Sequence, residues 1–160
     1  MGGNGVKILV TSDSHGRPRA LRQAIEREQP HMMLFLGDGF YDAEKMREEY
    51  PDLPICTVPG NCDYGSLSEP EQLIEADGVR ILIMHGHTRG VKYGGMNAYY
   101  AARELGADVL LYGHTHRPLV DYDGTLYTMN PGSIRYSGTY GVLMIENGKV
   151  TDCGTRVLEK

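Results

Sequence analysis

Five of the six histidines fall in three short clusters that could bind metal ions together with nearby carboxylates. They are His15, His85, His87, His114 and His116. Asp13 lies two residues before His15, the same spacing as between His114 and His116. If the backbone stays extended there, the two side chains of each pair leave the same face of the chain and can meet one cation. Imidazole nitrogens and carboxylate oxygens together suit borderline divalent metals, so the spacing predicts a metal site.

Two more candidate ligands stand in glycine-flanked turns. Asp38 is enclosed by Gly37 and Gly39, and Asn61 follows Gly60. With these two, the chain offers seven nitrogen and oxygen ligands: Asp13, His15, Asp38, Asn61, His85, His114 and His116. Seven ligands are too many for one tetrahedral ion, whereas two ions bridged by a carboxylate would use them all.

Each of these clusters directly follows a short apolar run that is typical of a buried strand. The runs span residues 7–12, 32–36, 55–58, 79–84 and 109–112. In an open α/β sheet, ligands bind in the loops beyond the carboxyl ends of the strands. We therefore expect the clusters to come together at one edge of a sheet.

Helical patterns separate several of the strands. Apolar residues at helical spacing around Ala20 to Ile25 indicate a first helix. Residues 42–50 predict a charged helix that stops at Pro51, and residues 96–105 predict a third helix with Gly106 as its C-cap.

Three dipeptides are typical of hairpin turns: Asp77-Gly78, Asp123-Gly124 and Asn147-Gly148. The chain thus begins as a βαβαβ unit and continues as a β-rich part with one helix. This order predicts an α/β fold in a single domain of residues 1–160, with two sheets packed face to face and helices on the outside.

The composition indicates which binding partners and cellular compartments the protein is expected to have. A chain of 160 residues with 41% apolar residues can bury one sizeable core. The net charge of -5 argues against an extended nucleic-acid surface. No apolar run is long enough to span a membrane or to form a signal-peptide core. Three cysteines without CxxC spacing are typical of a reducing compartment, so we expect a cytoplasmic protein.

The order of the motifs resembles that of the calcineurin-like metallophosphoesterases over nearly the whole chain. The motifs are Asp-x-His, Gly-Asp-Gly, Gly-Asn-Cys-Asp, His-Gly-His and Gly-His-Thr-His. Within this superfamily the chain is similar to the small single-domain phosphodiesterases of the YfcE type, which share the cysteine of the third motif and an Asn-Pro-Gly-Ser sequence, here residues 130–133. The resemblance implies a four-layer αββα sandwich of two mixed β-sheets flanked by helices.

The resemblance also implies a ligand set for two divalent ions. The first ion would bind Asp13, His15 and His116, the second Asn61, His85 and His114, and Asp38 would bridge both. Manganese is the metal that the family most often uses in assays, with Fe, Ni²⁺ and Zn²⁺ as alternatives that the ligand types also allow.

For function, the resemblance implies hydrolysis of a small or activated phosphodiester by a metal-bridging hydroxide. Asn61 would bind metal and also orient a phosphate oxygen. Many members of the family have histidine where Cys62 stands, and a thiol is a poor proton donor to the leaving oxygen. His87 could replace that acid, or could simply face solvent or support a ligand. Arg89, together with Cys62, is a candidate for substrate contacts, although a charge in a loop is often only solvated.

Two other functions stay open at this point. One is a phosphomonoesterase or nucleotidase, which the missing histidine disfavours. The other is a protein-interaction scaffold like the retromer subunit that has this fold, which the intact ligand set disfavours. We expect a small phosphoester as substrate, and relatives in the family suggest a homodimer or homotetramer.

Overall fold

The computed structural model of the protein describes residues 5–64 and 69–158. Within these ranges the strands are β1 (Val6–Thr11), β2 (Met32–Phe35), β3 (Ile55–Thr57), β4 (Glu71–Ala76), β5 (Val79–Met84), β6 (Val109–Tyr112), β7 (Leu119–Tyr122), β8 (Tyr127–Asn130), β9 (Thr139–Glu146) and β10 (Lys149–Val157). The helices are α1 (Pro18–Glu28), α2 (Phe40–Glu49) and α3 (Met96–Glu104), with short 3₁₀ turns η1 (His87–Arg89) and η2 (Val91–Tyr93).

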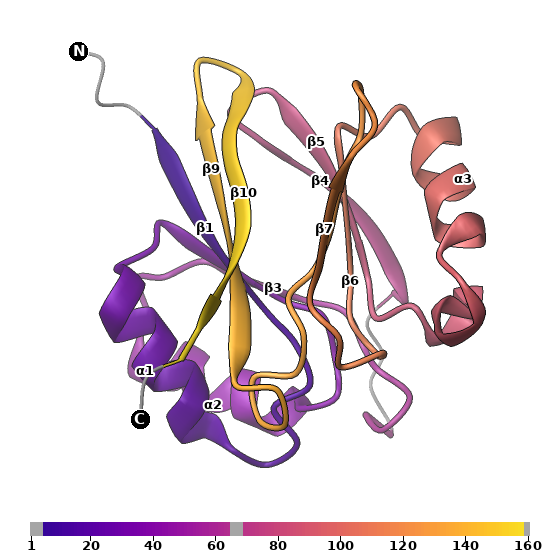
Figure 1. Cartoon of the computed structure of the whole chain (residues 1–160). Helices are drawn as coiled ribbons and strands as arrows, with labels where there is room; N and C mark the ends of the chain where they lie inside the picture. The colour runs from indigo at the N-terminus through magenta and orange to yellow at the C-terminus, as the bar shows by residue number, and fades with distance from the viewer. Residues whose placement is uncertain (1–4, 65–68, 159–160) are drawn as a thin grey trace.

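The strands form two five-stranded mixed sheets. The first has the order β10-β9-β1-β2-β3. In it β1, β2 and β3 are parallel to one another, and β9 pairs antiparallel with both of its neighbours, β1 and β10. The second has the order β4-β5-β6-β8-β7, with β5, β6 and β8 parallel. Figure 1 shows the two sheets in the middle, α1 and α2 beside the first, and α3 beside the second.

Three apolar layers hold this arrangement together. Alternate residues of one strand point to opposite faces, so Ile8 packs between the two sheets while Leu9 packs under α1 and α2. In the second sheet Ile83 likewise faces the first sheet, and Leu82 faces α3. Both faces of the central strands are buried, which explains their continuous apolar sequences. The predicted αββα sandwich is confirmed.

The predicted elements agree with the observed ones to within two residues at their ends, except that α1 continues three residues beyond Ile25. The three hairpin turns are also confirmed, because Asp77-Gly78 joins β4 to β5, Asp123-Gly124 lies between β7 and β8, and Asn147-Gly148 joins β9 to β10. Asp77 and Gly78 both have positive φ, 47° and 82°, as a type I′ turn requires.

In the described part of the chain, no helix combines the length and the apolar character needed to cross a lipid bilayer.

Candidate metal centre

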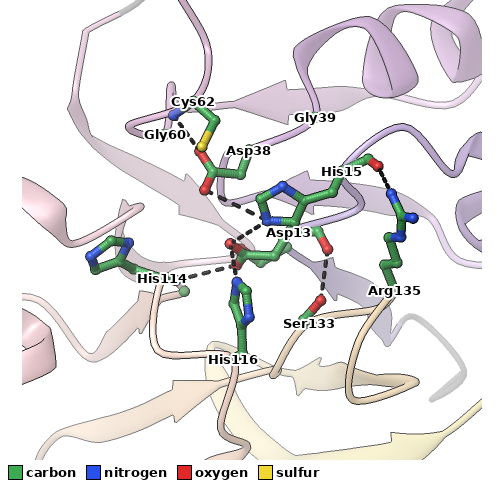
Figure 2. Close-up of polar contacts among 12 residues, drawn as sticks. Asp13, His15, Asp38, Gly39, Gly60, Cys62, His114, His116, Ser133 and Arg135 are labelled. Atoms are coloured by element: carbon green, nitrogen blue, oxygen red, sulfur yellow. Dashed lines mark hydrogen bonds and ion pairs between the residues drawn. The ribbon is translucent and has the colours of Figure 1, made fainter.

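The predicted ligands gather beyond the carboxyl ends of five strands. Two residues, Asp13 and His15, follow β1, and Asp38 follows β2. The others come from the loops after β3, β5 and β6: Asn61, His85, His114 and His116. Residues more than a hundred positions apart thus meet at one place, as the strand-end argument predicted. Figure 2 shows His15 and His116 on either side of the Asp13 carboxylate, with Asp38 close by.

The backbone at these ligands differs from our expectation. Asp13 and His15 have φ of 56° and 42°, and His114 and His116 have φ of 68° and 63°. The assumption that the chain stays extended past the strand ends was therefore wrong. The chain turns through left-handed conformations, which for residues other than glycine cost free energy and are found mainly at functional sites. Consequently His114 and His116 do not share one target.

One ligand group forms around Asp13, which is fully buried. Its Oδ1 lies 3.2 Å from His116 Nε2 and 3.5 Å from His15 Nε2. Its Oδ2 accepts hydrogen bonds from the Ser12 hydroxyl and, at 3.2 Å, from the backbone N–H of His114. Because these donors fix one oxygen, the other is oriented toward the two imidazoles.

A second group forms around His85, which is also fully buried. Its Nε2 lies 3.1 Å from His114 Nδ1, 3.0 Å from Asn61 Oδ1 and 3.3 Å from Asp38 Oδ2. Its Nδ1 lies 2.7 Å from the carbonyl oxygen of Leu36, to which it can donate. That hydrogen bond leaves Nε2 as the free lone pair, which is the usual arrangement for a metal-binding histidine.

Asp38 lies between the two groups. Its Oδ2 is 3.3 Å from His85 Nε2 and 3.8 Å from His15 Nε2, so the same oxygen faces one histidine of each group. Among the described residues, three sets of side chains have their ligand atoms within 4.8 Å of one another: Asp13 with His15 and His116, Asp38 with His85 and His114, and His15 with Asp38 and Cys62. The first two sets contain side chains that the family resemblance assigns to the same ion. Cys62 in the third set was not expected to face a metal ion.

The chemistry of these residues fits divalent ions of the borderline class. His15 Nε2 is buried and has no hydrogen-bond partner among the described residues, although two carboxylates lie close to it. A buried nitrogen without a partner is uncommon in folded proteins, and a cation would complete its coordination. The mixture of imidazole nitrogen and carboxylate oxygen is the set that Mn²⁺, Fe, Ni²⁺ and Zn²⁺ accept.

The pKa directions of Asp38 and His114 favour the metal-binding forms at neutral pH, whereas for His85 burial is outweighed by the carboxylates of Asp38 and Asp13, which raise its pKa. Burial acts to raise the pKa of Asp38, but the hydrogen bond and charge of His85 and the backbone N–H of Cys62 hold it below its usual range. Burial and the neighbouring His85 lower the pKa of His114 to about 4. An ionised carboxylate and a neutral imidazole are the forms that coordinate a cation.

Asp63 holds two of the ligand loops together. Its two carboxylate oxygens accept four backbone N–H groups at 2.7–3.0 Å, from Asp38, Gly39, Phe40 and Gly60. Asp63 fixes the backbone of both loops, because the loops approach closely enough to aim their N–H groups at one carboxylate.

The Asn-Pro-Gly-Ser sequence supports the remaining ligand loops. Asn130 Nδ2 donates to the carbonyl of Gly113 at 3.0 Å, beside His114. The Ser133 hydroxyl donates to the carbonyl of Asp13 at 2.8 Å. The following Arg135 donates to the carbonyl of His15 (Figure 2). These contacts explain why the motif accompanies the metal ligands. The sequence did not single out Arg135, although its position two residues after the motif was a usable signal.

The three remaining candidate residues, Cys62, His87 and Arg89, lie at different distances from the predicted metal ligands. Cys62 is exposed, and its Sγ lies 3.6 Å from Asn61 Nδ2. Burial and the charge of Asp38 raise the pKa of the Cys62 thiol. The ring of His87 lies 5.4 Å from that of His85, and its buried Nδ1 has no partner among the described residues. Burial and His85 lower the pKa of His87.

The structure does not bring Arg89 to the metal ligands. Its guanidinium makes two hydrogen bonds to the Glu71 carboxylate, at 2.5 and 2.9 Å. It lines a cavity with α3 residues such as Tyr100, away from the histidines. The chain from His87 onward forms the two 3₁₀ turns η1 and η2, which the sequence did not predict. These turns direct the Arg89 side chain toward Glu71 on β4.

Two cavities of about 600 Å³ each have linings that include predicted ligands or their neighbours in the chain. One is lined by His15, Asp38 and Cys62 together with aromatic side chains. The other includes Thr115, which stands between His114 and His116, and the cationic side chains of Lys92 and Arg117. A substrate phosphate at the ligand cluster would therefore have room for an attached group in the cavity lined by His15, Asp38 and Cys62.

Comparison with known proteins finds a matching family and several relatives. Residues 6–148 match the model of the calcineurin-like phosphoesterase superfamily domain. A probable metallophosphoesterase of Bacillus subtilis, YsnB, is 36% identical over 152 residues, which cover 91% of this chain and 88% of the relative. The phosphodiesterase YfcE of Escherichia coli is 26% identical, covering 81% of this chain and 79% of the relative.

Solved structures agree with this result. A predicted phosphoesterase from Streptococcus pneumoniae superimposes with a TM-score of 0.77 at 26% identity, covering 89% of this chain and 84% of that one. Vacuolar Protein Sorting 29 from Cryptosporidium parvum superimposes with a TM-score of 0.76, covering 98% of this chain and 99% of that one. At 16% identity, the second likeness concerns the fold alone.

Proposed function

Since the chain belongs to the calcineurin-like phosphoesterase superfamily, we propose that it is a metal-dependent phosphodiesterase that hydrolyses a small or activated phosphodiester. The relatives carry the names metallophosphoesterase and phosphodiesterase, and the chain is a hydrolase of phosphoric ester bonds. What we propose beyond this family membership is the preference for diesters and the roles of single residues.

The observation that carries the proposal is the position of Asp38. One of its oxygens faces His15 and His85, which belong to two separate ligand groups. A carboxylate so placed can serve two cations at once, and this arrangement is typical of sites that hydrolyse phosphoesters. When bound, the two ions supply an activated water at neutral pH and positive charge for the phosphate oxygens.

The chain's own residues hold and orient the reacting groups. Asp13 is fixed by Ser12 and the His114 N–H, so it cannot rotate away from the imidazoles. Asn61 can contact the centre through Oδ1, which lies 3.0 Å from His85 Nε2, and its Nδ2 remains able to donate to a phosphate oxygen. Preorganised ligands and donors of this kind lower the barrier because they do not rearrange during the reaction.

Cys62 bears on the choice of substrate. A thiol, with an ordinary pKa of about 8.5, is a weaker proton donor at neutral pH than a histidine would be at the same position. Leaving groups that depart without a proton should therefore be favoured. We expect Cys62→His to raise the rate for esters with poor leaving groups by a larger factor than the rate for nitrophenyl esters.

The proposal is tested by comparing bis-p-nitrophenyl phosphate with p-nitrophenyl phosphate in the presence of Mn²⁺, Fe, Ni²⁺ or Zn²⁺. We expect faster turnover of the diester, and the chelator-treated protein serves as the control. A faster rate with the monoester would favour the phosphomonoesterase instead.

A second candidate is a protein-interaction scaffold, for which the likeness to Vacuolar Protein Sorting 29 provides only the shared fold. The seven ligand positions speak against it, because all carry side chains able to bind a metal ion. Failure of every divalent ion to support turnover of either ester, together with a stoichiometric protein partner in a pull-down, would favour the scaffold.

A further inference from the structure

The cavity beside His15, Asp38 and Cys62 has an aromatic wall. Four aromatic side chains line it: Phe40, Tyr41, Tyr64 and Tyr136. We propose that this cavity binds a flat aromatic ring carried by one ester group of the substrate, as in a nucleoside phosphodiester. The inference rests on the proposed function, because it places the phosphate of that ester at the metal ligands.

The exposure of these side chains is the first argument. Tyr41 is 81% exposed, Tyr64 is 89% exposed and Tyr136 is 61% exposed. They come from α2 and from the loops after β3 and β8, so only the fold brings them together. Tyrosine has a large apolar face, and several exposed rings around one cavity form a surface on which a planar ring can stack.

The position of Tyr136 is the second argument. Its ring stacks on His116 with centroids 5.4 Å apart, and it lies 5.3 Å from the ring of His15. The Arg135 guanidinium lies 5.1 Å from the same ring while it donates to the His15 carbonyl. Tyr136 is thus held next to two metal ligands with most of its side chain exposed. A ring stacked on it would lie within a short linker of the reacting phosphate.

The second cavity provides the contrast. It contains Lys92 and Arg117, and its aromatic lining residue, Tyr112, is only 5% exposed. Such a lining suits a charged or sugar-like group rather than a stacked ring. The two cavities therefore differ in chemistry, and the ring fits the cavity that Tyr41 and Tyr136 line.

Binding of simple monoesters to the Mn²⁺-loaded protein tests the inference. Adenosine 5′-monophosphate and ribose 5-phosphate differ only in the base, so the ratio of their dissociation constants, measured by calorimetry, isolates the contribution of the ring. We expect about tenfold tighter binding of the nucleotide, the effect of one base–aromatic stacking contact. Phenyl phosphate against methyl phosphate makes the same comparison without a ribose and distinguishes a simple aryl group from a nucleoside.

Two variants locate the effect. Tyr41→Ala and Tyr136→Leu should each reduce the ratio to about threefold or less, with the affinity for ribose 5-phosphate kept in Tyr41→Ala. Tyr93→Ala is the matched control, because Tyr93 is 96% exposed but lies on η2, outside the aromatic cavity. It should leave the ratio unchanged.

Equal binding of nucleotide and sugar phosphate, with no preference for phenyl phosphate either, would overturn the inference. So would a ring preference that survives in both tyrosine variants but disappears in Arg117→Ala. Failure of the proposed function has a different signature: ribose 5-phosphate would then bind equally well with and without Mn²⁺, whatever the ring contributes.

Discussion

Two buried groups of acidic side chains in this molecule differ in the partners that surround their carboxylates. Glu28, only 4% exposed, receives Lys7 Nζ at 2.9 Å, Arg156 Nη1 at 2.7 Å and the Tyr140 hydroxyl at 2.5 Å. Asp13 and Asp38 are equally buried, but they face histidines, and one of those imidazole nitrogens has no hydrogen bond within the described chain. The first cluster is completed by the protein itself, whereas the second leaves an imidazole nitrogen that a cation could coordinate.

The backbone around the clusters differs in the same way. Glu28 ends α1, and its partners Lys7, Tyr140 and Arg156 lie in β1, β9 and β10. The metal ligands instead lie in loops, several of them with positive φ. Regular elements with satisfied charges add to stability, while strained loops store free energy that the fold must supply. The comparison teaches that stability and chemistry occupy separate parts of this structure.

The largest expected effect is that of Asp38→Asn on activity. Loss of the shared charge should reduce phosphodiesterase activity by about 100-fold or more and abolish the rise in Tm on adding Mn²⁺. Without metal, the variant should unfold within about 1 kcal/mol of the wild type, because the amide oxygen can still accept from the Cys62 N–H. Wild-type rates in this variant would refute the bridging role.

A pair of glycine variants tests whether the metal loops are more constrained than an ordinary hairpin. Gly37 and Gly124 have nearly the same φ, 102° and 103°. An added Cβ at Gly37 would lie 2.6 Å from Gly60 N and 2.9 Å from His85 Nδ1, whereas one at Gly124 would meet nothing within 4 Å. We expect Gly37→Ala to be less stable than Gly124→Ala by about 2 kcal/mol in urea unfolding and to lose activity as well. An equal loss of stability in the two variants would show that the ligand loops are no more constrained than the hairpin.

Glu28→Gln probes the other cluster. The change weakens three charge-assisted or polar contacts and should lower the free energy of unfolding by between about 1 and 2 kcal/mol at pH 7. Because none of the named partners of Glu28 lies in a ligand loop, kcat/KM of the variant should stay within about twofold of the wild-type value. A large loss of activity without loss of stability would show that the two clusters are coupled.

The pH dependence of the same variant gives the smallest effect. Burial acts to raise the pKa of Glu28, but the hydrogen bonds from Lys7 and Tyr140 and the charge of Arg156 hold it below the ordinary value of 4.5. The folded state therefore binds the proton less tightly than the unfolded state, so the stabilisation is present above about pH 4.5 and is lost as the pH falls through the lowered pKa. Urea unfolding at pH 7 and pH 3 should show the difference between wild type and Glu28→Gln shrinking at pH 3. A difference that grows at pH 3 would contradict this sign.

Local patterns were sufficient for much of the fold. The continuous apolar run around Ile8 and Leu9 predicts a buried strand, and Asp77-Gly78 predicts the hairpin turn between β4 and β5, because both signals depend on residues close in sequence. The pairing of β9 with β1 was not predictable in this way. It joins residues such as Val142 and Leu9, which no local rule connects.

For the site, the amino-acid sequence by itself determined which side chains are chemically able to bind metal and that each follows a strand. Only the tertiary structure decided their directions, since the left-handed turns at Asp13 and His114 override the alternation of an extended chain. It also decided that Asp63 collects backbone N–H groups, that Arg89 pairs with Glu71, and that Tyr41 and Tyr136 share a cavity. The physical reason is that ligand identity is a property of single residues, whereas orientation depends on contacts between segments that only folding brings together.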